Sequence, residues 1–403
     1  MATNNRQRMR RLLLPHLAIW VLGAGFMRIA AVPAEICPAA EPNEVRAAAV
    51  AAGDWLARGL DPDGRFVYGY DRDTDLVSSD YSIVRHGGAT VALFQLTVDV
   101  DNTFGGPAES ALQWLLEREI ETAPDTSAIG NGDARLGTTA FTIVALTQRR
   151  SISGDRTYDA LLRRLGRFVL GQRDGRGGLL AFWSPATRAP VPGAYGPFAT
   201  GEALWALAEL GTTFPDEGWA EAALPTLRYI ASGDRERREG HLSRLPDHWA
   251  AYALEALNDD LLDERLISYA RRLAGYFSLR LRFEAQRRGE GLNLWVRWYP
   301  GPPAGVGTAG EGLAALHRLA QRNRALSDLL PDMTERLACM GGFMVGRQVN
   351  GVEAAGGPRP VSRRCRVAGS GRRSSTRCSG TTAPRCRCWP AAAGSSWTGA
   401  QRS

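Results

Sequence analysis

Three acidic residues stand at the start of helical segments that are otherwise apolar. Glu202 and Glu311 both follow short stretches rich in Thr, Ala and Gly, and Asp247 precedes a third such segment. Burying a carboxylate is costly unless the group is paired or functional. One protonated and one ionised carboxyl group can together hydrolyse a glycosidic bond. The sequence therefore predicts Glu202 and Glu311 as a catalytic pair, with Asp247 as the substitute; the alternative is that each caps its helix or pairs with a nearby Arg.

Two histidines suit a different reaction, elimination or epimerisation at a uronic acid. This chemistry needs a cation to neutralise the carboxylate and a base to remove the α-proton. His86, beside Arg85, and His248 supply candidate bases, although either can instead be a buried, hydrogen-bonded structural group. Trp249 can stack on a sugar ring or belong to the core. The substrate-binding candidates in these segments are Tyr68, Tyr70, Arg85, Arg135, Tyr195, Trp249, Arg297, Trp298 and Tyr299.

A third chemistry is indicated by Asp259-Asp260-Leu261-Leu262-Asp263, whose spacing resembles the magnesium-diphosphate motif of some terpenoid enzymes. These acids lie in a short turn after an apolar helical segment, at the opposite end from the other candidates. We interpret them as helix caps and solvated charge.

Helical periodicity runs through most of the chain and places these residues. Apolar residues recur at three- and four-residue spacing, without convincing strand alternation, and predict eleven helices. Their ranges are 42–60, 81–98, 107–120, 137–149, 156–171, 197–210, 216–232, 247–258, 263–282, 307–322 and 326–346.

The connections between these helices alternate in length. Long glycine-rich loops (61–80, 121–136, 172–196, 233–246 and 283–306) precede every second helix, and short turns follow it. The helices after long loops are rich in small apolar residues, as at Gly137-Thr138-Thr139-Ala140, and suit an inner ring. The others carry charge on one face, as at Arg163-Arg164, and suit an outer ring. This pattern predicts a repeat of helical hairpins.

Residues 42–346 resemble the α/α-toroid superfamily, a barrel of up to six helical hairpins. The segment Leu170-Gly171-Gln172-Arg173-Asp174-Gly175 is similar to a repeat common in such barrels. The superfamily includes glycosidases, polysaccharide lyases, sugar epimerases and terpenoid cyclases, so the resemblance implies the architecture more than the activity. It also implies that the inner helices run parallel and bring the candidate residues to one end. A closed ring has twelve helices, so the twelfth is expected in the tail.

The charge distribution argues against nucleic-acid binding. The net charge is +7, but five Arg lie in residues 1–34 and ten in residues 354–403, where there are no acids. The body keeps 34 Arg against all 42 acidic residues, a net charge of −8. A nucleic-acid-binding domain needs a basic surface, so we expect no nucleic-acid partner.

The N-terminus has the pattern of an export signal. Four Arg between positions 6 and 11 precede the mostly apolar run from Leu12 to Met27, and small residues end at Ala34. Residues 1–34 are predicted to be a signal peptide, or a membrane anchor if uncleaved. The domain is therefore expected outside the cytoplasm, with membrane contact only through this segment.

The C-terminal composition changes abruptly near Ala354. Residues 354–403 are rich in Arg, Ser, Cys and Gly, without a hydrophobic period, and are predicted to be disordered. Alternating Arg and Cys is what GC-rich codons yield out of register, so we hypothesise a frameshift near 351–357; a genuine basic tail is the alternative. Four of six Cys lie here and Cys37 beside the leader, which predicts a body (35–353) without a disulfide.

The sequence thus predicts an all-α toroid that acts on a carbohydrate, by hydrolysis, elimination or epimerisation, in a cell-envelope or acidic polysaccharide. We expect neither a cofactor nor a metal, and leave the oligomeric state open. A terpenoid cyclase-like or prenyltransferase-like enzyme, and a non-catalytic toroid that binds a glycan or a protein, are the alternatives.

Overall fold

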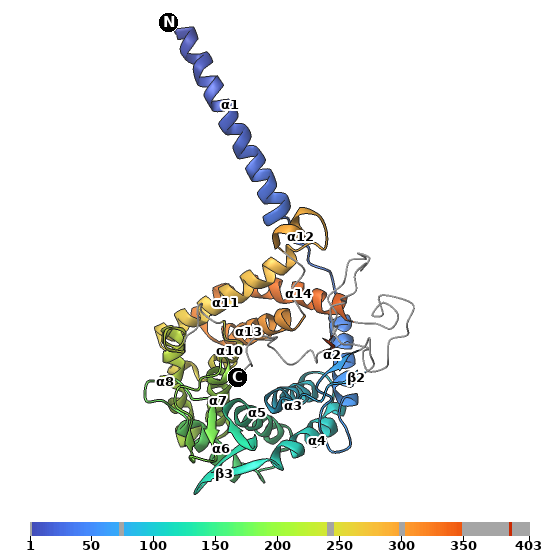
Figure 1. Ribbon diagram of the computed structural model, residues 1–403, viewed down its shortest axis with the longest axis vertical. Coiled ribbons are helices and arrows are strands. Elements are labelled where there is room, and N and C mark those ends of the chain that lie inside the picture. The colour runs from blue at the N-terminus through green and yellow to red at the C-terminus, as the bar shows by residue number, and fades with distance from the viewer. Residues whose placement is uncertain (1, 72–75, 240–245, 298–302, 349–386, 389–403) are drawn as a thin grey trace.

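All eleven predicted helices are present, with ends within a few residues of those expected. The computed structural model describes residues 2–71, 76–239, 246–297, 303–348 and 387–388 (Figure 1). The eleven helices are α2 (Pro42–Arg58), α3 (Ile83–Asp99), α4 (Gly105–Leu116), α5 (Leu136–Ser153), α6 (Asp159–Gly171), α7 (Ala199–Thr213), α8 (Trp219–Ala231), α10 (His248–Ala256), α11 (Glu264–Ala285), α13 (Pro303–Arg322) and α14 (Leu330–Arg347).

These helices form two concentric layers, which confirms the predicted toroid. The inner ring contains α3, α5, α7, α10 and α13, each packed against the next, and the outer ring contains α2, α4, α6, α8, α11 and α14 (Figure 1). Inner helices are buried nearly all round: α5 is buried continuously from Leu136 to Thr147. Outer helices bury one stripe, as α6 does with Leu161, Leu165 and Phe168. The different burial follows from the different composition of the two sets.

The two rings close to different extents among the described residues. In the outer ring, α14 packs against α2 and joins the two ends of the body. In the inner ring, no described helix stands between α13 and α3. The predicted twelfth helix and most of the tail fall at 349–386 and 389–403, outside the described residues.

Short strands form in the connecting loops, where the sequence showed no convincing alternation. An antiparallel sheet runs in the order β3 (Glu119–Ala123), β4 (Thr126–Asn131), β5 (Asp133–Arg135), β6 (Phe182–Ser184) and β7 (Ala189–Pro190). Two-residue strands β1 (Tyr70–Asp71), β2 (Leu76–Val77) and β8 (Arg387–Cys388) also pair. Such strands are too short to show a period. Pairs such as Ala134 with Trp183 depend on two loops being neighbours in space.

Shorter helical pieces complete the fold. They are the long N-terminal helix α1 (Ala2–Phe26), the π-helix η1 (Met27–Ala31), the 3₁₀ turns η2 (Asn102–Phe104), η3 (Pro215–Glu217), η4 (Asp259–Leu261) and η5 (Arg324–Leu329), and the two short helices α9 (Asp234–Arg238) and α12 (Gly291–Arg297). Both α9 and α12 lie within segments that the sequence predicted to be long loops.

The segment after α1 is docked onto the body of the protein. Ala30 is fully buried, and its carbonyl accepts a hydrogen bond of 2.9 Å from the Asn293 side chain. The Ile36 amide donates to the carbonyl of Ala285 at 2.9 Å. Glu35 forms ion pairs with Arg282, at 2.7 Å, and with Arg336. Residues 30–36 are therefore an integral part of the packed structure.

A disulfide between Cys37 and Cys339 joins this segment to α14, so the predicted absence of a disulfide in the body is wrong. The two cysteines are 302 residues apart in sequence. Sequence spacing could not pair them, because they meet only when the outer ring closes. A cross-link over so long a chain restricts the unfolded state strongly, by about 5 kcal/mol in the chain-entropy description.

Candidate functional site

The inner helices run parallel, so their N-terminal ends gather at one end of the barrel. At this end, Glu202 of α7 lies against Gly137 of α5, and Asp247, before α10, lies against Gly201 of α7. At the other end, the Thr212 hydroxyl near the end of α7 donates to the carbonyl of Ala256, the last residue of α10, at 3.1 Å. N-terminal ends therefore lie beside N-terminal ends, and C-terminal ends beside C-terminal ends, as the toroid resemblance implied.

Glycines at the start of two inner helices make room for the acidic side chains. A Cβ on Gly137 would lie 2.2 Å from Oε2 of Glu202, and one on Gly201 would lie 2.3 Å from both carboxylate oxygens of Asp247. No real Cβ tolerates such distances, so each carboxyl group occupies the space that a side chain would fill. The small residues of the inner helices therefore position the acids as well as allowing close packing.

Glu202 is buried, with 8% of its surface exposed. Burial raises the pKa of its carboxyl group to about 8, and the negative charge of nearby Asp247 adds to the shift. A carboxyl group with this pKa is protonated at neutral pH and can donate a proton, as a general acid does.

Asp247 is the centre of a buried charged cluster. Its carboxylate accepts hydrogen bonds from the amides of Trp249 and Ala250, at 3.1 and 3.2 Å, and caps α10. It also accepts one from the guanidinium of Arg235, which is fully buried and donates to Glu236 at 2.9 Å. Burial raises the pKa of Asp247, and the Arg235 charge opposes that shift. An aspartate that caps a helix and pairs with an arginine chiefly positions the start of that helix. This is the structural alternative that the sequence left open for Asp247.

His248, the first residue of α10, faces Glu311 of α13. The distance from Nε2 of His248 to Oε2 of Glu311 is 3.8 Å, and this nitrogen is buried without a hydrogen-bond partner in the described structure. Burial lowers the pKa of His248 to about 3 and raises that of Glu311 to about 8. Both groups are therefore neutral at pH 7: the carboxyl group can donate a proton, and the imidazole has an unprotonated nitrogen but is a weaker base than an exposed histidine. The Glu311 side chain keeps 35% of its surface exposed, which gives this pair access to solvent.

The structure does not pair Glu202 with Glu311, as the sequence predicted, but places each of them beside a different residue. Glu202 interacts electrostatically with Asp247, and Glu311 lies beside His248. Asp247 and His248 are consecutive residues at the start of α10, and α10 packs between α7, which carries Glu202, and α13, which carries Glu311. Glu202, His248 and Glu311 form the set that we call the acid–base cluster.

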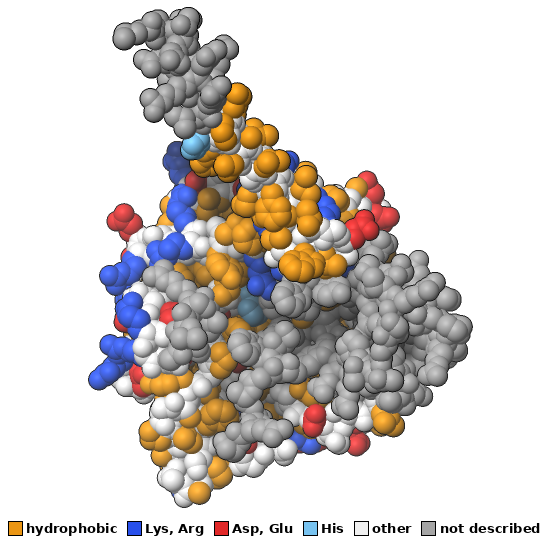
Figure 2. Space-filling view, turned by 45° about the horizontal axis from the view of Figure 1, so that its top comes forward, with side chains coloured by type: hydrophobic (Ala, Val, Ile, Leu, Met, Phe, Trp, Pro, Cys, Tyr) orange, Lys and Arg blue, Asp and Glu red, His pale blue; other side chains and the backbone are white. Residues whose placement is uncertain are grey.

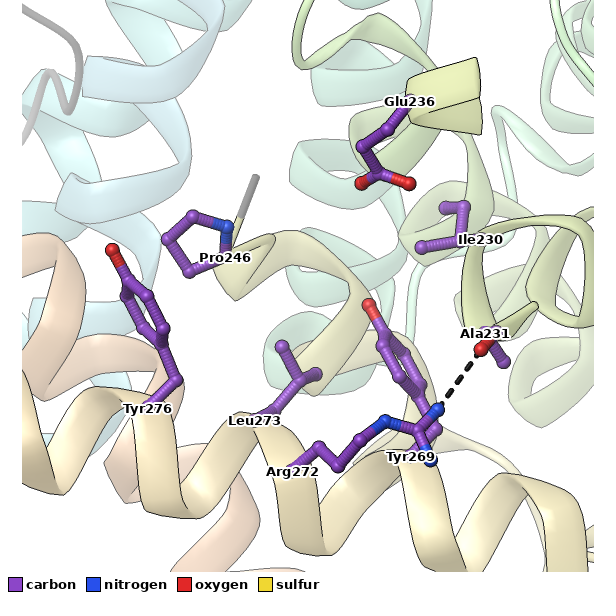
Figure 3. A pocket seen from close by; sticks show the side chains of 8 residues that line it. All are labelled: Ile230, Ala231, Glu236, Pro246, Tyr269, Arg272, Leu273 and Tyr276. Carbon is purple, nitrogen blue, oxygen red and sulfur yellow. Dashed lines mark hydrogen bonds between the residues drawn. The ribbon is translucent and has the colours of Figure 1, made fainter. Parts of the chain in front are cut away.

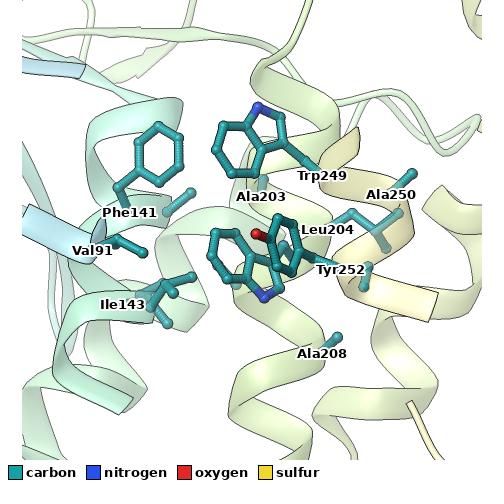
Figure 4. Packing of buried hydrophobic residues seen from close by; sticks show 14 of the residues in the cluster. Val91, Phe141, Ile143, Ala203, Leu204, Ala208, Trp249, Ala250 and Tyr252 are labelled. Carbon is teal, nitrogen blue, oxygen red and sulfur yellow. The ribbon is translucent and has the colours of Figure 1, made fainter. Parts of the chain in front are cut away.

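Trp249 belongs to an aromatic stack in the interior of the barrel. Its ring stacks on Trp205 at 5.4 Å and meets Phe141 edge-on at 5.0 Å. Tyr252, one turn further along α10, stacks on Trp205 at 4.5 Å (Figure 4). Only 8% of Trp249 is exposed. Trp249 is therefore part of the core, which was the alternative to a role in sugar stacking. The centroid of its ring lies 4.0 Å from that of His248, so the aromatic stack is an apolar wall beside this histidine.

His86 lies between the two rings of helices, away from the acid–base cluster. Its Nε2 lies 2.8 Å from the carbonyl of Ala111, its Nδ1 lies 2.6 Å from the Tyr81 hydroxyl, and its ring stacks on Trp114 at 4.4 Å. Burial lowers its pKa to about 4. Both ring nitrogens of a neutral imidazole are satisfied here, donating to the carbonyl and accepting from the hydroxyl. This geometry favours the structural alternative, so we do not carry His86 into the proposed site.

The predicted substrate-binding residues near α3, α5 and α7 have protein partners. Arg85 donates to the Tyr68 hydroxyl. Arg135 is near Asp133, at 3.4 Å, in β5. The Tyr195 hydroxyl donates to Asp174 at 2.9 Å. These residues line the segments that precede inner helices, where they remain candidates for ligand contact.

The described part of the loop from 283 to 306 places Arg297 outside the ring of helices. Arg297 ends α12, and its guanidinium lies 4.6 Å over the ring of Phe283. Helix α12 packs against η1, beside the N-terminal helix and outside the ring (Figure 1). This part of the loop folds outward onto the N-terminal segment, so contact between Arg297 and a ligand has no support from its position and stays a prediction. The side chain of Tyr70 and all of Trp298 and Tyr299 lie outside the described residues.

The aspartate-rich motif serves local structure, as interpreted from the sequence. Asp259 pairs with Arg322 at 2.6 Å. Asp263 caps α11 by accepting from the Leu266 amide at 3.0 Å, and pairs with Arg228 at 3.1 Å. The motif follows the C-terminal end of α10, opposite the acid–base cluster. In the described part of the chain, no three His, Cys, Asp or Glu side chains are grouped as metal ligands.

A small pocket lies on the outer side of the charged cluster. It is lined by Glu236, Tyr269, Arg272 and neighbouring apolar residues between α8, α9 and α11, and its volume is about 80 Å³ (Figure 3). Ligand pockets typically exceed about 300 Å³. This pocket is too small for a saccharide, and we assign the candidate site to the acid–base cluster.

Sequence reasoning missed the buried charges that support α10. Asp234-Arg235-Glu236-Arg237-Arg238-Glu239 looks like a solvated charge run, yet Arg235 and Glu236 are buried against Asp247. Glu239, which accepts from the Tyr229 hydroxyl at 3.1 Å, has its pKa raised to about 7 by burial.

Comparison with solved structures confirms the α/α-toroid fold. The chain is similar to a D-mannose isomerase, with a TM-score of 0.54 and 12% identity over 77% of this chain and 87% of that chain. A cellobiose 2-epimerase from Spirochaeta thermophila gives 0.53 and 15% over 76% and 86%. An unsaturated glucuronyl hydrolase specific for heparin gives 0.52 and 12% over 77% and 86%. No protein-family profile and no curated protein sequence matches this chain.

Proposed function

We propose that this chain is an exported enzyme that performs acid–base chemistry on a carbohydrate, with Glu202, His248 and Glu311 as the reacting groups. The observation that carries the proposal is geometric: Nε2 of His248 lies 3.8 Å from Oε2 of Glu311, and Glu202 is buried on the other side of α10. The raised pKa values of both glutamates are consistent with a role as proton donors. The similarity of the fold to sugar isomerases, epimerases and a glucuronyl hydrolase supports the substrate class.

The approach of His248 to Glu311, 3.8 Å apart, supports proton transfer at a sugar carbon. A neutral imidazole can remove a proton from a carbon atom. A protonated carboxyl group can return a proton to carbon in isomerisation or epimerisation, or protonate the departing oxygen in elimination. Hydrolysis by two carboxyl groups needs one of them ionised. Asp247, the third acid, is already held by Arg235 and two backbone amides. The inner-helix N-termini that meet here favour anionic groups, so uronic acids are included among the candidate sugars.

Export and membrane attachment are also part of the proposal. The segment Leu14–Ala31 is long and apolar enough to cross a membrane. Residues 30–36 are docked on the body, and Cys37 is in a disulfide, which is typical of oxidising compartments outside the cytoplasm. Cleavage after Ala34 would keep Glu35, Ile36 and Cys37 in place but would remove the buried Ala30 and its hydrogen bond with Asn293. Because of this contact, we propose that the segment is retained as an anchor.

The test is incubation of the full chain with neutral and uronate-containing glycans in D₂O, followed by mass spectrometry. Deuterium incorporation without cleavage indicates isomerisation or epimerisation, and an unsaturated product indicates elimination. We expect Glu202→Gln and His248→Gln each to lower turnover by roughly 10²-fold or more. The matched control is Glu221→Gln, an exposed residue of α8. Cleavage with addition of water would replace this mechanism by hydrolysis, and unaltered turnover in both variants would reject the site.

A further inference from the structure

An apolar patch lies beside the base of the N-terminal helix. In α12, Leu292, Trp295 and Val296 expose 55%, 89% and 47% of their surface. In the last turns of α11, Leu279 and Phe283 expose 48% and 43%. Figure 2 shows apolar side chains continuing from the projecting helix onto the body beneath it. Exposed apolar clusters of this kind mark sites of contact with a membrane or another protein.

Helix α12 exposes large apolar side chains and buries a polar one, the reverse of a helix on the surface of a soluble protein. Asn293, its uncharged polar residue, is buried, with only 3% of its surface exposed. The Asn293 side chain donates to the carbonyl of Ala30 at 2.9 Å and accepts from the Arg288 amide at 2.7 Å. These two bonds fix the orientation of α12, so that its large apolar side chains face outward.

The same hydrogen bond ties α12 to the end of the apolar segment. Leu14–Ala31 contains 18 residues, and a helix of that length is about 27 Å long, close to the thickness of a bilayer core. Ala30 lies at the end of this segment that adjoins the body. The basic residues before Leu14 favour a cytoplasmic N-terminus, which puts Ala30, and with it α12, at the outer boundary of the bilayer.

We propose that the outward faces of α12 and of the end of α11 are inserted into the interfacial layer of the membrane that α1 crosses. This inference rests on the retained anchor of the proposed function. Trp is enriched at this depth in membrane proteins, and Trp295 is the most exposed large apolar residue of the patch. Arg297, over the ring of Phe283, supplies a cation for lipid headgroups at the patch.

The contact would fix how the enzyme stands on the membrane. Helix α1 projects from the rim of the ring, next to α12 (Figure 1). Residues 30–36 already tie the ring to the anchor, and a second contact at α12 would hold the rim of the ring against the lipid. The end of the barrel with the acid–base cluster then opens along the membrane surface, toward polymers of the cell envelope.

The test is depth-dependent quenching of tryptophan fluorescence in the full chain reconstituted into vesicles of phosphatidylcholine and phosphatidylglycerol. The contribution of Trp295 is obtained as the wild type minus Trp295→Phe. We expect lipids brominated near the headgroup to quench about half of this contribution or more, and lipids brominated near the chain ends to quench less. The control is Ile152→Trp, at an exposed position in α5 remote from α12, which brominated lipids should not quench.

Two results would overturn the proposal. Quenching of the Trp295 contribution by aqueous iodide, with none by brominated lipid, would show that the patch is in water. Protection from both quenchers would show that protein, such as a second copy of this chain, covers it. Resistance of the reconstituted chain to carbonate extraction reports separately on the anchor, so loss of the anchor and failure of the α12 contact are distinguishable. Circular dichroism of Trp295→Phe verifies that the variant is folded.

Discussion

The substitution Glu202→Gln should change how the stability of this protein depends on pH. Burial raises the pKa of Glu202 from an ordinary value of 4.5 to about 8. The folded chain therefore holds this proton more tightly than the unfolded chain does. Stability from this group is fully present below pH 4.5 and is lost as the pH rises through 8. The difference between the pKa of Glu202 in the folded chain and its pKa in the unfolded chain corresponds to roughly 4–5 kcal/mol of unfolding free energy.

Gln has nearly the shape of a protonated Glu and does not ionise. We expect Glu202→Gln to match the wild type within about 1 kcal/mol at pH 5, and to be more stable than the wild type by about 3–4 kcal/mol at pH 9. Glu209, Glu239 and Glu311, whose pKa values are also raised, contribute losses of the same sign. Because these residues are present in both proteins, the difference between wild type and variant isolates Glu202.

The assay is urea unfolding of the full chain in detergent micelles, followed by tryptophan fluorescence at five pH values from 5 to 9. Glu221→Gln, on the exposed face of α8, is the matched control and should leave the profile unchanged. Parallel pH profiles for the wild type and Glu202→Gln would refute the reasoning, since they would mean that Glu202 ionises equally easily in the folded and unfolded chains.

Three further predictions concern Gly137, Asp247 and the disulfide of Cys37. Gly137→Ala would place a Cβ 2.2 Å from a carboxylate oxygen of Glu202 and so displace it; we expect turnover to fall by roughly 10-fold or more in the glycan assay. Asp247→Asn removes the fully buried one of the two carboxylates that pair with Arg235, and should lower the unfolding free energy by up to about 3–5 kcal/mol in urea titrations at pH 7. Cys37→Ser removes the cross-link to α14 and should cost about 2–5 kcal/mol, measured as a lower melting temperature.

Each of these predictions has an internal control. Gly171→Ala adds a Cβ with no atom within 4 Å and should leave turnover unchanged. Asp216→Asn alters an exposed acid, so a similar loss of stability there would contradict the buried-pair argument. The melting temperature of the wild type under reducing conditions should equal that of Cys37→Ser; a wild type insensitive to reductant would show that the disulfide does not stabilise the protein.

The frameshift hypothesis remains a prediction about the coding DNA. The residues that would follow α14 are outside the described part of the chain, and no described helix stands between α13 and α3. Resequencing tests the idea directly: an uninterrupted frame would refute it. A restored frame should supply the twelfth helix that the toroid resemblance implies.

The sequence by itself determined which segments are helical and how they alternate. Apolar spacing is a local property, so all eleven helices could be found, and the long and short connections distinguished inner from outer ones. The same reasoning identified Glu202, His248 and Glu311, because polar residues at the start of apolar helices are conspicuous.

Only the tertiary structure decided which side chains meet. His86 and His248 look alike in sequence, yet one hydrogen-bonds to the outer helix α4 and the other lies beside Glu311. Arg235 belongs to an apparently solvated run but is buried against Asp247. Cys37 reaches α14 only after the outer ring closes. Periodicity sets the buried face of a helix, but the partner on that face comes from a segment distant in the chain, and no local pattern records it.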